Sequence, residues 1–157
     1  MLRIAILILS LALVPGLAFA DDGPKDSVAA HLGGFPGILA FLNNFAVPAL
    51  LADPEIAPFF APDRLTESPA DIEQCLAMLL DHDLGGSSPH NGTVLASGHQ
   101  CRSSMSNIHR GFAIPDRVID RFIAIVGEQA ERAGVHPADI AAVAKVLERY
   151  RGGVRNK

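Results

Sequence analysis

Short cysteine motifs are absent from this sequence. It contains two cysteines, Cys75 and Cys101, and has neither a CxxC nor a CxxCH segment. Their absence argues against a zinc ribbon, a thioredoxin-type redox pair and the covalent attachment of a c-type haem. Whether the two cysteines form a disulfide depends on whether the protein lies in an oxidising compartment.

Basic stripes and alternating strands are also missing. The chain has 13 Lys and Arg against 17 Asp and Glu, with a formal net charge of −4, and no basic cluster that would indicate a nucleic-acid partner. No segment alternates polar and apolar residues with the period of two that β-strands require. Apolar residues recur instead at helical spacing, so the sequence predicts an all-α fold.

The first 20 residues resemble a targeting segment. Arg3 precedes an apolar run from Ile4 to Ala20, which ends in Ala18-Phe19-Ala20 before Asp21. A secretory signal peptide cleaved after Ala20 fits this pattern; the alternative, a membrane anchor, needs about 20 apolar residues and a flanking stop. We therefore expect a periplasmic protein with one domain, residues 21–157, and no stable membrane insertion after cleavage. In that oxidising compartment the default is one disulfide between Cys75 and Cys101.

About five helices are predicted, separated by glycine and proline corners. Ser27, Ser68 and the dipeptides Pro115-Asp116 and Pro137-Ala138 are typical helix starts. Pro48 should kink the second helix or restart it near Val47. The expected helices occupy residues 28–32, 36–52, 69–84, 116–133 and 137–151, with double glycines at 33–34, 85–86 and 152–153. Residues 87–104 form a long loop, whose length suggests mobility or a function.

His109 is the strongest candidate functional residue. Met105 and His109 are four residues apart and share one face of a helix, which Ser103 or Ser104 can cap and Gly111 can end after about two turns. A neutral imidazole can offer one ring nitrogen to a metal while the other donates to a carbonyl oxygen. Apolar neighbours suit a large flat cofactor, which describes an axial haem ligand. The alternative is a histidine that satisfies a hydrogen bond in the core.

Several motifs, taken in order, resemble those of the truncated haemoglobins, most closely group 1. The resemblance covers roughly residues 30–154. The matching segments are Leu32-Gly33-Gly34, Phe45, Asp53-Pro54, Phe59-Phe60, Leu84-Gly85-Gly86, Met105-x3-His109-x-Gly111-x2-Ile114 and Ala133-Gly134-Val135. Each motif is weak alone, but their order and spacing together are specific.

The resemblance implies a two-over-two helical sandwich that binds haem b without a covalent bond. It makes His109 the proximal iron ligand and places Phe60 against the haem. We expect further haem contacts from Phe45, Leu76, Met105, Phe112 and Ile114. Such a protein would bind O2 or NO, in oxygen transport or in NO or redox chemistry.

The chain departs from this family on the distal side. Members of group 1 usually have a tyrosine after the phenylalanine that matches Phe45, whereas Ala46 and then Val47 follow it here. The only tyrosine is Tyr150, and Gln74 is the best polar candidate for the distal side. A pocket without a hydrogen-bond donor discriminates poorly in favour of O2.

Three alternatives stay open at this point. An exported helical adaptor or sensor on the globin fold could have lost haem. His82, His90 and His99 could bind a metal, although their spacing matches no standard zinc pattern. A side activity of the NO dioxygenase or peroxidase kind is also compatible with these residues, and the sequence identifies no redox partner.

Overall fold

The computed structural model describes residues 26–157, so the predicted signal peptide lies outside the described residues. This part of the chain is helical and holds no β-strand, only isolated bridges between Val94 and Gln100 and between Ile114 and Arg155. The elements, in chain order, are α1 (Val28–His31), α2 (Gly34–Phe41), the π-helical turn η1 (Leu42–Ala46), α3 (Val47–Ala52), the 3-10 turn η2 (Ala57–Phe60), α4 (Pro69–Asp83), α5 (Met105–Ile108), α6 (Asp116–Arg132) and α7 (Pro137–Val154). The predicted all-α class is confirmed.

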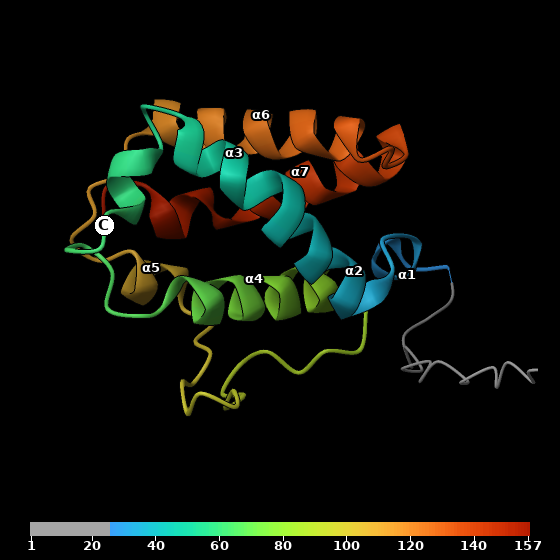
Figure 1. The fold of residues 1–157 in the computed structure, drawn as a ribbon, viewed down its shortest axis with the longest axis horizontal. Coiled ribbons are helices and arrows are strands. Elements are labelled where there is room, and N and C mark those ends of the chain that lie inside the picture. Colours follow the sequence, from blue (N-terminus) through green and yellow to red (C-terminus); the bar gives the residue numbers. More distant parts are fainter. Residues whose placement is uncertain (1–25) are drawn as a thin grey trace, which may run out of the picture.

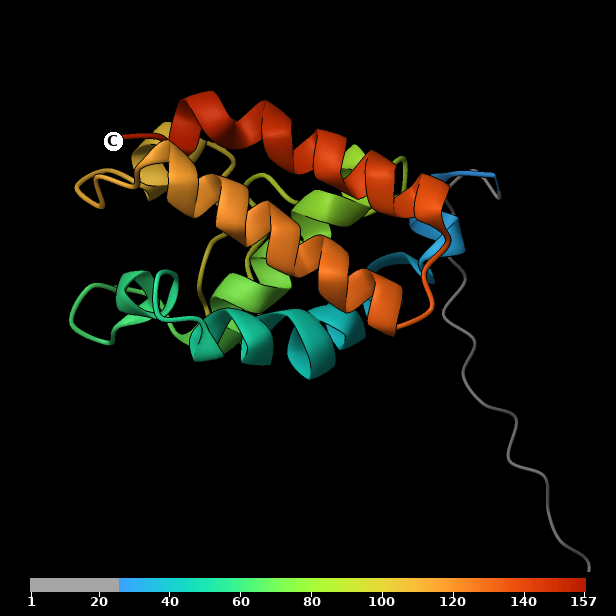
Figure 2. The same cartoon turned by 90° about the horizontal axis from the view of Figure 1, so that it is seen from above.

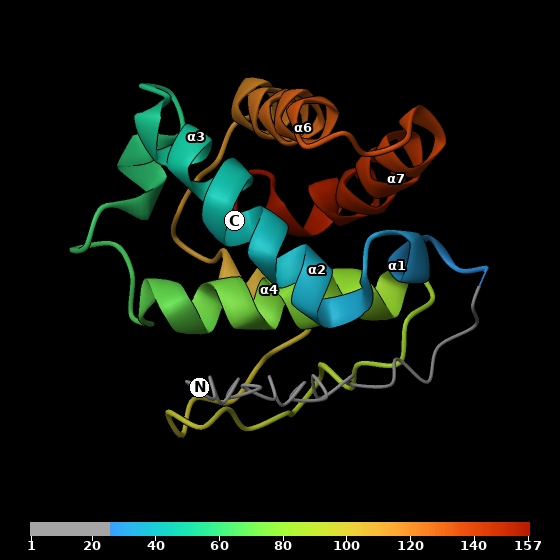
Figure 3. The ribbon, with the colours of Figure 1, turned by 45° about the vertical axis from the view of Figure 1, so that its right-hand side comes forward.

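Two pairs of helices are stacked on each other. In Figure 1, α6 and α7 run side by side along the upper part of the molecule, while α4 runs along the lower part. The continuous helical stretch of α2, η1 and α3 crosses obliquely between them, and α2 packs on α4. Figure 2 shows α6 beside α7 from above, and Figure 3 shows this pair above the crossed pair of α2 and α4. The result is a two-over-two helical sandwich.

Side-chain caps and glycines set the ends of several helices as the sequence predicts. The Ser27 hydroxyl accepts from Ala30 N, and the Ser68 hydroxyl accepts from Asp71 N, each satisfying an amide that a helix start leaves unpaired. Gly33 and Gly85 take φ angles of 82° and 90°, which a residue with a Cβ adopts only with strain. The first two double-glycine corners are therefore confirmed.

The predicted break at Pro48 takes the form of a π-helical turn. Pro48 lacks an amide proton, and its ring crowds the carbonyl four residues earlier, so a regular α-helix cannot pass through it. The chain widens to π geometry over Leu42–Ala46 and resumes α geometry at Val47. Because η1 absorbs the irregularity, the whole Gly34–Ala52 stretch stays continuous.

This stretch is long and apolar enough to cross a membrane by length and composition alone. Its residues Ile38, Leu42, Ala46 and Leu50, however, are buried in the two hydrophobic clusters of the domain. One face of this stretch therefore packs into the core of the domain.

Two expectations, about the helix before His109 and the last helix, are wrong. Gly152 and Gly153 do not end the last helix, because α7 continues through both glycines to Val154. The helix before His109 is one turn long rather than two, and it covers Met105–Ile108 with His109 as its C-cap. Ser104 occupies the N-cap without a side-chain cap hydrogen bond. The two departures are connected, since α5 packs on the end of α7.

Candidate functional site

A cavity of about 270 Å³ lies between η2, α4, α5, α6 and α7. Its size is just below the range of about 300 to 1,000 Å³ that small-molecule sites span. Its wall is largely apolar and is formed by Ile56, Phe59, Phe60, Leu65, Ile72, Cys75, Leu76, Leu79, Met105, Ile108, Phe112, Ile114, Val118, Ile119, Phe122, Ile123, Leu147 and Val154. His109 also lines this cavity. The structure therefore brings His109 together with five of the predicted contact residues, namely Phe60, Leu76, Met105, Phe112 and Ile114.

The hydrogen bond of His109 fixes which of its nitrogens is available. Its Nδ1 lies 2.9 Å from the carbonyl oxygen of Met105. A carbonyl oxygen can only accept, so Nδ1 must carry the proton and donate it. In the neutral ring, Nε2 then keeps its lone pair, which is the tautomer that a metal-ligating histidine needs.

The environment of His109 favours this neutral form. Burial lowers the pKa of the imidazole, and the hydrogen bond to Met105 opposes that shift only in part. The edge of the Phe112 ring lies beside it, with ring centroids 6.3 Å apart. Near neutral pH His109 is therefore an uncharged imidazole on an apolar wall.

The short helix α5 is held in place by the C-terminal end of the chain. A Cβ atom built on Gly153 would lie 2.6 Å from Cβ of Met105, so only glycine permits this close approach of α7 to α5. After His109, the amides of Gly111 and Ala113 both donate to the carbonyl oxygen of Lys157 at 2.9 Å. The segment around His109 is thus fixed by contacts with residues more than 40 positions further along the chain.

Charged and polar side chains meet at the rim of the same cavity. They are Glu67, His99, Arg102, Tyr150 and Arg151. Arg102 forms an ion pair with Glu67, and Arg151 forms ion pairs with Asp116, Asp120 and Glu148. Two guanidinium groups at the rim of a largely apolar cavity could bind the carboxylates of a large apolar ligand.

The loop of residues 87–104 is tied to α4 and contributes to this rim. The structure joins Cys75 of α4 to Cys101 by a disulfide, as predicted, with the Cα atoms 5.4 Å apart. Ser97 donates to Asp71 at 2.6 Å, and this bond is the main reason why the pKa of Asp71 is lowered. With the Arg102–Glu67 pair, three separate connections hold the loop against the start of α4. Of this loop, only His99 and Arg102 line the cavity.

The predicted distal residues do not line the cavity of His109. Ala46 is fully buried in the core, and neither it nor Val47 lines the cavity of His109. Gln74 lines neither described cavity, and its amide points back to the carbonyl of Ala70. Gln74 lies two residues from both Ile72 and Leu76, which places it on the opposite side of α4. The structure thus does not bring Gln74 to the site.

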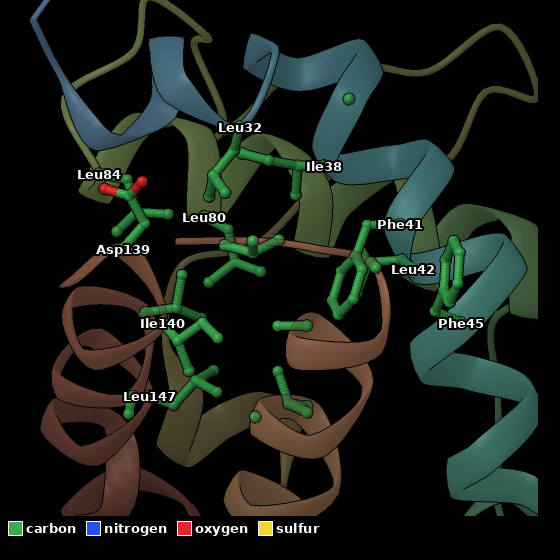
Figure 4. Close-up of a pocket in the computed structure, with 18 of the residues that line it drawn as sticks. Leu32, Ile38, Phe41, Leu42, Phe45, Leu80, Leu84, Asp139, Ile140 and Leu147 are labelled. Carbon is green, nitrogen blue, oxygen red and sulfur yellow. The ribbon is translucent and has the colours of Figure 1, made fainter. Parts of the chain in front are cut away.

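A second cavity, of about 550 Å³, lies at the other end of the sandwich. Figure 4 shows Ile38 and Phe41 facing Ile140 and Leu147 across it. Phe45, a predicted cofactor contact, lines this cavity and not the one with His109. Both cavities share four wall residues, Leu76, Phe122, Ile123 and Leu147.

The three candidate histidines do not form the alternative metal site. His82 and His90 lie close together, with ring centroids 5.0 Å apart, whereas His99 lines the cavity of His109. Among residues 26–157 no group of three or more His, Cys, Asp or Glu side chains could hold a metal ion.

Sequence reasoning missed two kinds of residue at the site. Arg102 and Glu67 carry no motif, and only their ion pair across the rim reveals them. Val118 and Phe122 are apolar residues of α6 that line the cavity, but helical periodicity cannot tell a cavity wall from a packed core.

A sandwich of two crossed helical pairs, with a single histidine on a short helix facing an apolar cavity, defines the two-over-two class of globin folds. Comparison with solved structures confirms this class. The truncated haemoglobin of Tetrahymena pyriformis in its Fe(III) form is similar with a TM-score of 0.67 and 23% identity, over 83% of this chain and 99% of that one. The chain therefore has the truncated-haemoglobin fold.

Two bacterial proteins show the same likeness. The 2/2 haemoglobin of Synechococcus sp. PCC 7002, solved in the cyanomet state with covalently attached haem, has a TM-score of 0.67 and 19% identity, over 83% of this chain and 99% of its own. The cold-adapted truncated haemoglobin of Pseudoalteromonas haloplanktis TAC125 has a TM-score of 0.62 and 20% identity, over 83% and 98%. No protein-family model matches the sequence, and no curated protein sequence matches it.

Proposed function

We propose that this chain is a periplasmic haem protein of the truncated haemoglobin kind, similar to group 1, that binds O2 or NO. The observation that carries the proposal is the tautomer of His109. Its Nδ1 donates to Met105, so the Nε2 lone pair is available in a cavity with an apolar wall. An adaptor on the same fold that has lost haem would need only the hydrogen bond to Met105, and not an imidazole on the wall of an apolar cavity.

The residues of the cavity fit haem b. Nε2 of His109 would hold the iron, Phe60 and Met105 would contact the porphyrin, and Arg102 and Arg151 at the rim would meet its propionates. Haem would supply an iron atom that can bind a diatomic molecule. Both cysteines are joined in the disulfide, so no free thiol in the described chain could attach the haem covalently.

The residues that α4 contributes determine what a bound ligand would meet. Ile72, Leu76 and Leu79 line the cavity, and none of them can donate a hydrogen bond. The protein would therefore favour polar bound O2 only weakly over less polar ligands. This supports a role in which O2 is released quickly or NO is the ligand. In such a role the haem would exchange electrons with a redox partner.

The first prediction tests His109 against a second histidine at the same cavity. We expect His109→Ala to abolish the Soret band of protein reconstituted with ferric haem while the helical circular dichroism signal persists, because the change removes a ligand and little packing. His99→Ala is the matched control, since His99 lines the cavity from the loop, and it should keep the band.

Two measurements complete this test. Transfer of haem to apomyoglobin should be fast from His109→Ala and slow from the wild type and His99→Ala. A full Soret band in His109→Ala, together with its loss in His99→Ala, would reassign the ligand to the loop and refute the proposal.

A further inference from the structure

Arg64 joins two parts of the wall of the His109 cavity from outside. It lies in the loop between η2 and α4, where its amide donates to the carbonyl oxygen of Ala61 at 2.9 Å. Its guanidinium carbon lies 5.2 Å from the centroid of the Phe59 ring and 5.1 Å from that of the Phe112 ring. Both phenylalanines line the cavity, one from η2 and the other from the segment after α5. One guanidinium group is therefore shared by two separate pieces of the wall.

The contact of Arg64 with Phe112 combines stacking with a hydrogen bond. Its Nη2 donates to the carbonyl oxygen of Phe112 at 3.0 Å. A guanidinium within about 6 Å of a ring centroid is attracted to the face of the ring, and its planar fork can donate hydrogen bonds at the same time. Within residues 26–157, no other hydrogen bond or ion pair joins the loop 61–68 to the segment 109–115. Arg64 is therefore the polar link between these two segments.

The segment that Arg64 holds has a strained backbone. Ala113 takes a φ angle of 52°, in the left-handed region that is unfavourable for residues with a Cβ atom. Such a conformation persists only where the surroundings fix it. On one side, the amides of Gly111 and Ala113 donate to the carbonyl oxygen of Lys157, and on the other, Arg64 holds the carbonyl of Phe112. The C-terminal end of the chain and Arg64 thus fix this turn between them.

Phe112 connects Arg64 to His109. The Phe112 ring lies edge-on to the imidazole, with ring centroids 6.3 Å apart and an angle of 65° between the ring planes. The backbone joins the same two residues, because the amide of Phe112 donates to the carbonyl oxygen of His109 at 3.1 Å. A displacement of Phe112 would therefore change the packing of the imidazole that faces the cavity.

We propose that Arg64 is a positioning residue of the site, which holds Phe112 against His109 and keeps the cavity closed at its edge between Phe59 and Phe112. Its role in retaining the cofactor rests on the proposed function, because that role requires haem in the cavity. The ordering of Phe112 is a property of the protein without haem as well. Loss of Arg64 would free the strained turn, so the cofactor would dissociate faster.

Hydrogen exchange, measured on the full chain with and without haem, tests the ordering of the turn. Arg64→Met keeps a long apolar stem and removes the guanidinium. Exchange at the amides of Gly111 and Ala113 should then accelerate by about tenfold more than exchange at the amide of Ile125, which is buried in the core on α6. A residue that contributed only to overall stability would accelerate all three amides equally when removed.

Transfer of haem to apomyoglobin tests the retention of the cofactor. Transfer from Arg64→Met should be about tenfold faster than from the wild type, the effect of one lost charge-assisted hydrogen bond. Arg64→Lys keeps the charge but lacks the planar fork that stacks and donates together, so it should restore only part of the retention. Arg117→Met is the matched control and should behave as the wild type, because Arg117 is 74% exposed, pairs with Glu55 and does not line the cavity.

The outcomes separate this inference from the proposed function. A wild type that takes up no haem would overturn the proposed function and the retention of the cofactor with it, while exchange in the haem-free chain would still decide whether Arg64 orders the turn. Exchange at Gly111 and Ala113 that accelerates no more than at Ile125, or equal haem transfer from Arg64→Met and the wild type, would overturn the inference about Arg64 and leave the assignment of His109 in place.

Discussion

The contact between Gly153 and Met105 offers a sharp test of how the site is positioned. A methyl group at position 153 would lie 2.6 Å from Cβ of Met105. Carbon atoms pack at about 3.5 to 4.0 Å, so α5 would have to move by an amount on the order of 1 Å. Overpacking of this kind typically costs about 1 to 3 kcal/mol, against a gain in helix propensity of about 1 kcal/mol for alanine over glycine.

Gly152→Ala is the matched control for Gly153→Ala. Both glycines are in α7, but a Cβ at Gly152 meets nothing within 4 Å. Gly152→Ala should therefore gain up to about 1 kcal/mol of stability, while Gly153→Ala should lose up to about 2 kcal/mol. Urea unfolding of the apoprotein measures both values.

The same pair of variants reports on His109. His109 follows Met105 by one helical turn and hydrogen-bonds its carbonyl, so a displaced Met105 also displaces the imidazole of His109. Haem transfer to apomyoglobin should be faster from Gly153→Ala than from the wild type and unchanged in Gly152→Ala. Equal stability and equal transfer rates in the two variants would show that α5 does not depend on this contact.

Two further predictions concern the walls of the cavity. Leu76→Gln places a hydrogen-bond donor on the apolar wall that α4 provides, and the O2 dissociation rate should fall by about ten- to a hundredfold, the effect of a hydrogen bond worth about 1.5 to 3 kcal/mol. Gln74→Leu is the control and should leave the O2 dissociation rate unchanged. Slow O2 release from the wild type would mean that another donor is present. Removing the disulfide with Cys75→Ser and Cys101→Ser opens a covalent loop of 26 residues and should lower the free energy of unfolding by about 3 to 4 kcal/mol. An unchanged urea midpoint in this variant, or two free thiols in the unfolded, unreduced wild type, would contradict the pairing.

The sequence predicts most of the fold because its signals are local. Ser27 and Ser68 cap the helices that follow them, and Gly33 and Gly85 form the corners where their left-handed conformation is needed. Each of these devices acts within four residues, so the pattern of residue types is sufficient. The pairing of Cys75 with Cys101 could likewise be predicted from composition.

The errors arise where distant segments meet. Gly152-Gly153 is a typical helix end by sequence, yet at Gly153 the absence of a side chain serves the approach of α5. Gln74 is a reasonable polar candidate by position, but the register of α4 turns it away from both described cavities. The pairing of Arg102 with Glu67 links residues 35 positions apart. None of these contacts has a local signal.

The His109 side of the cavity is held by more contacts than the side that α4 forms. His109 is fixed by a hydrogen bond to Met105, by the close approach of Gly153 and by a segment tied to Lys157. The residues that α4 adds to the cavity are apolar, and the charged groups stay at the rim. A site that stored O2 would need a donor near the bound ligand, because a hydrogen bond of about 1.5 to 3 kcal/mol sets its residence time. In the proposed haem protein, this asymmetry would hold the cofactor firmly from the His109 side and leave bound O2 without a donor from α4.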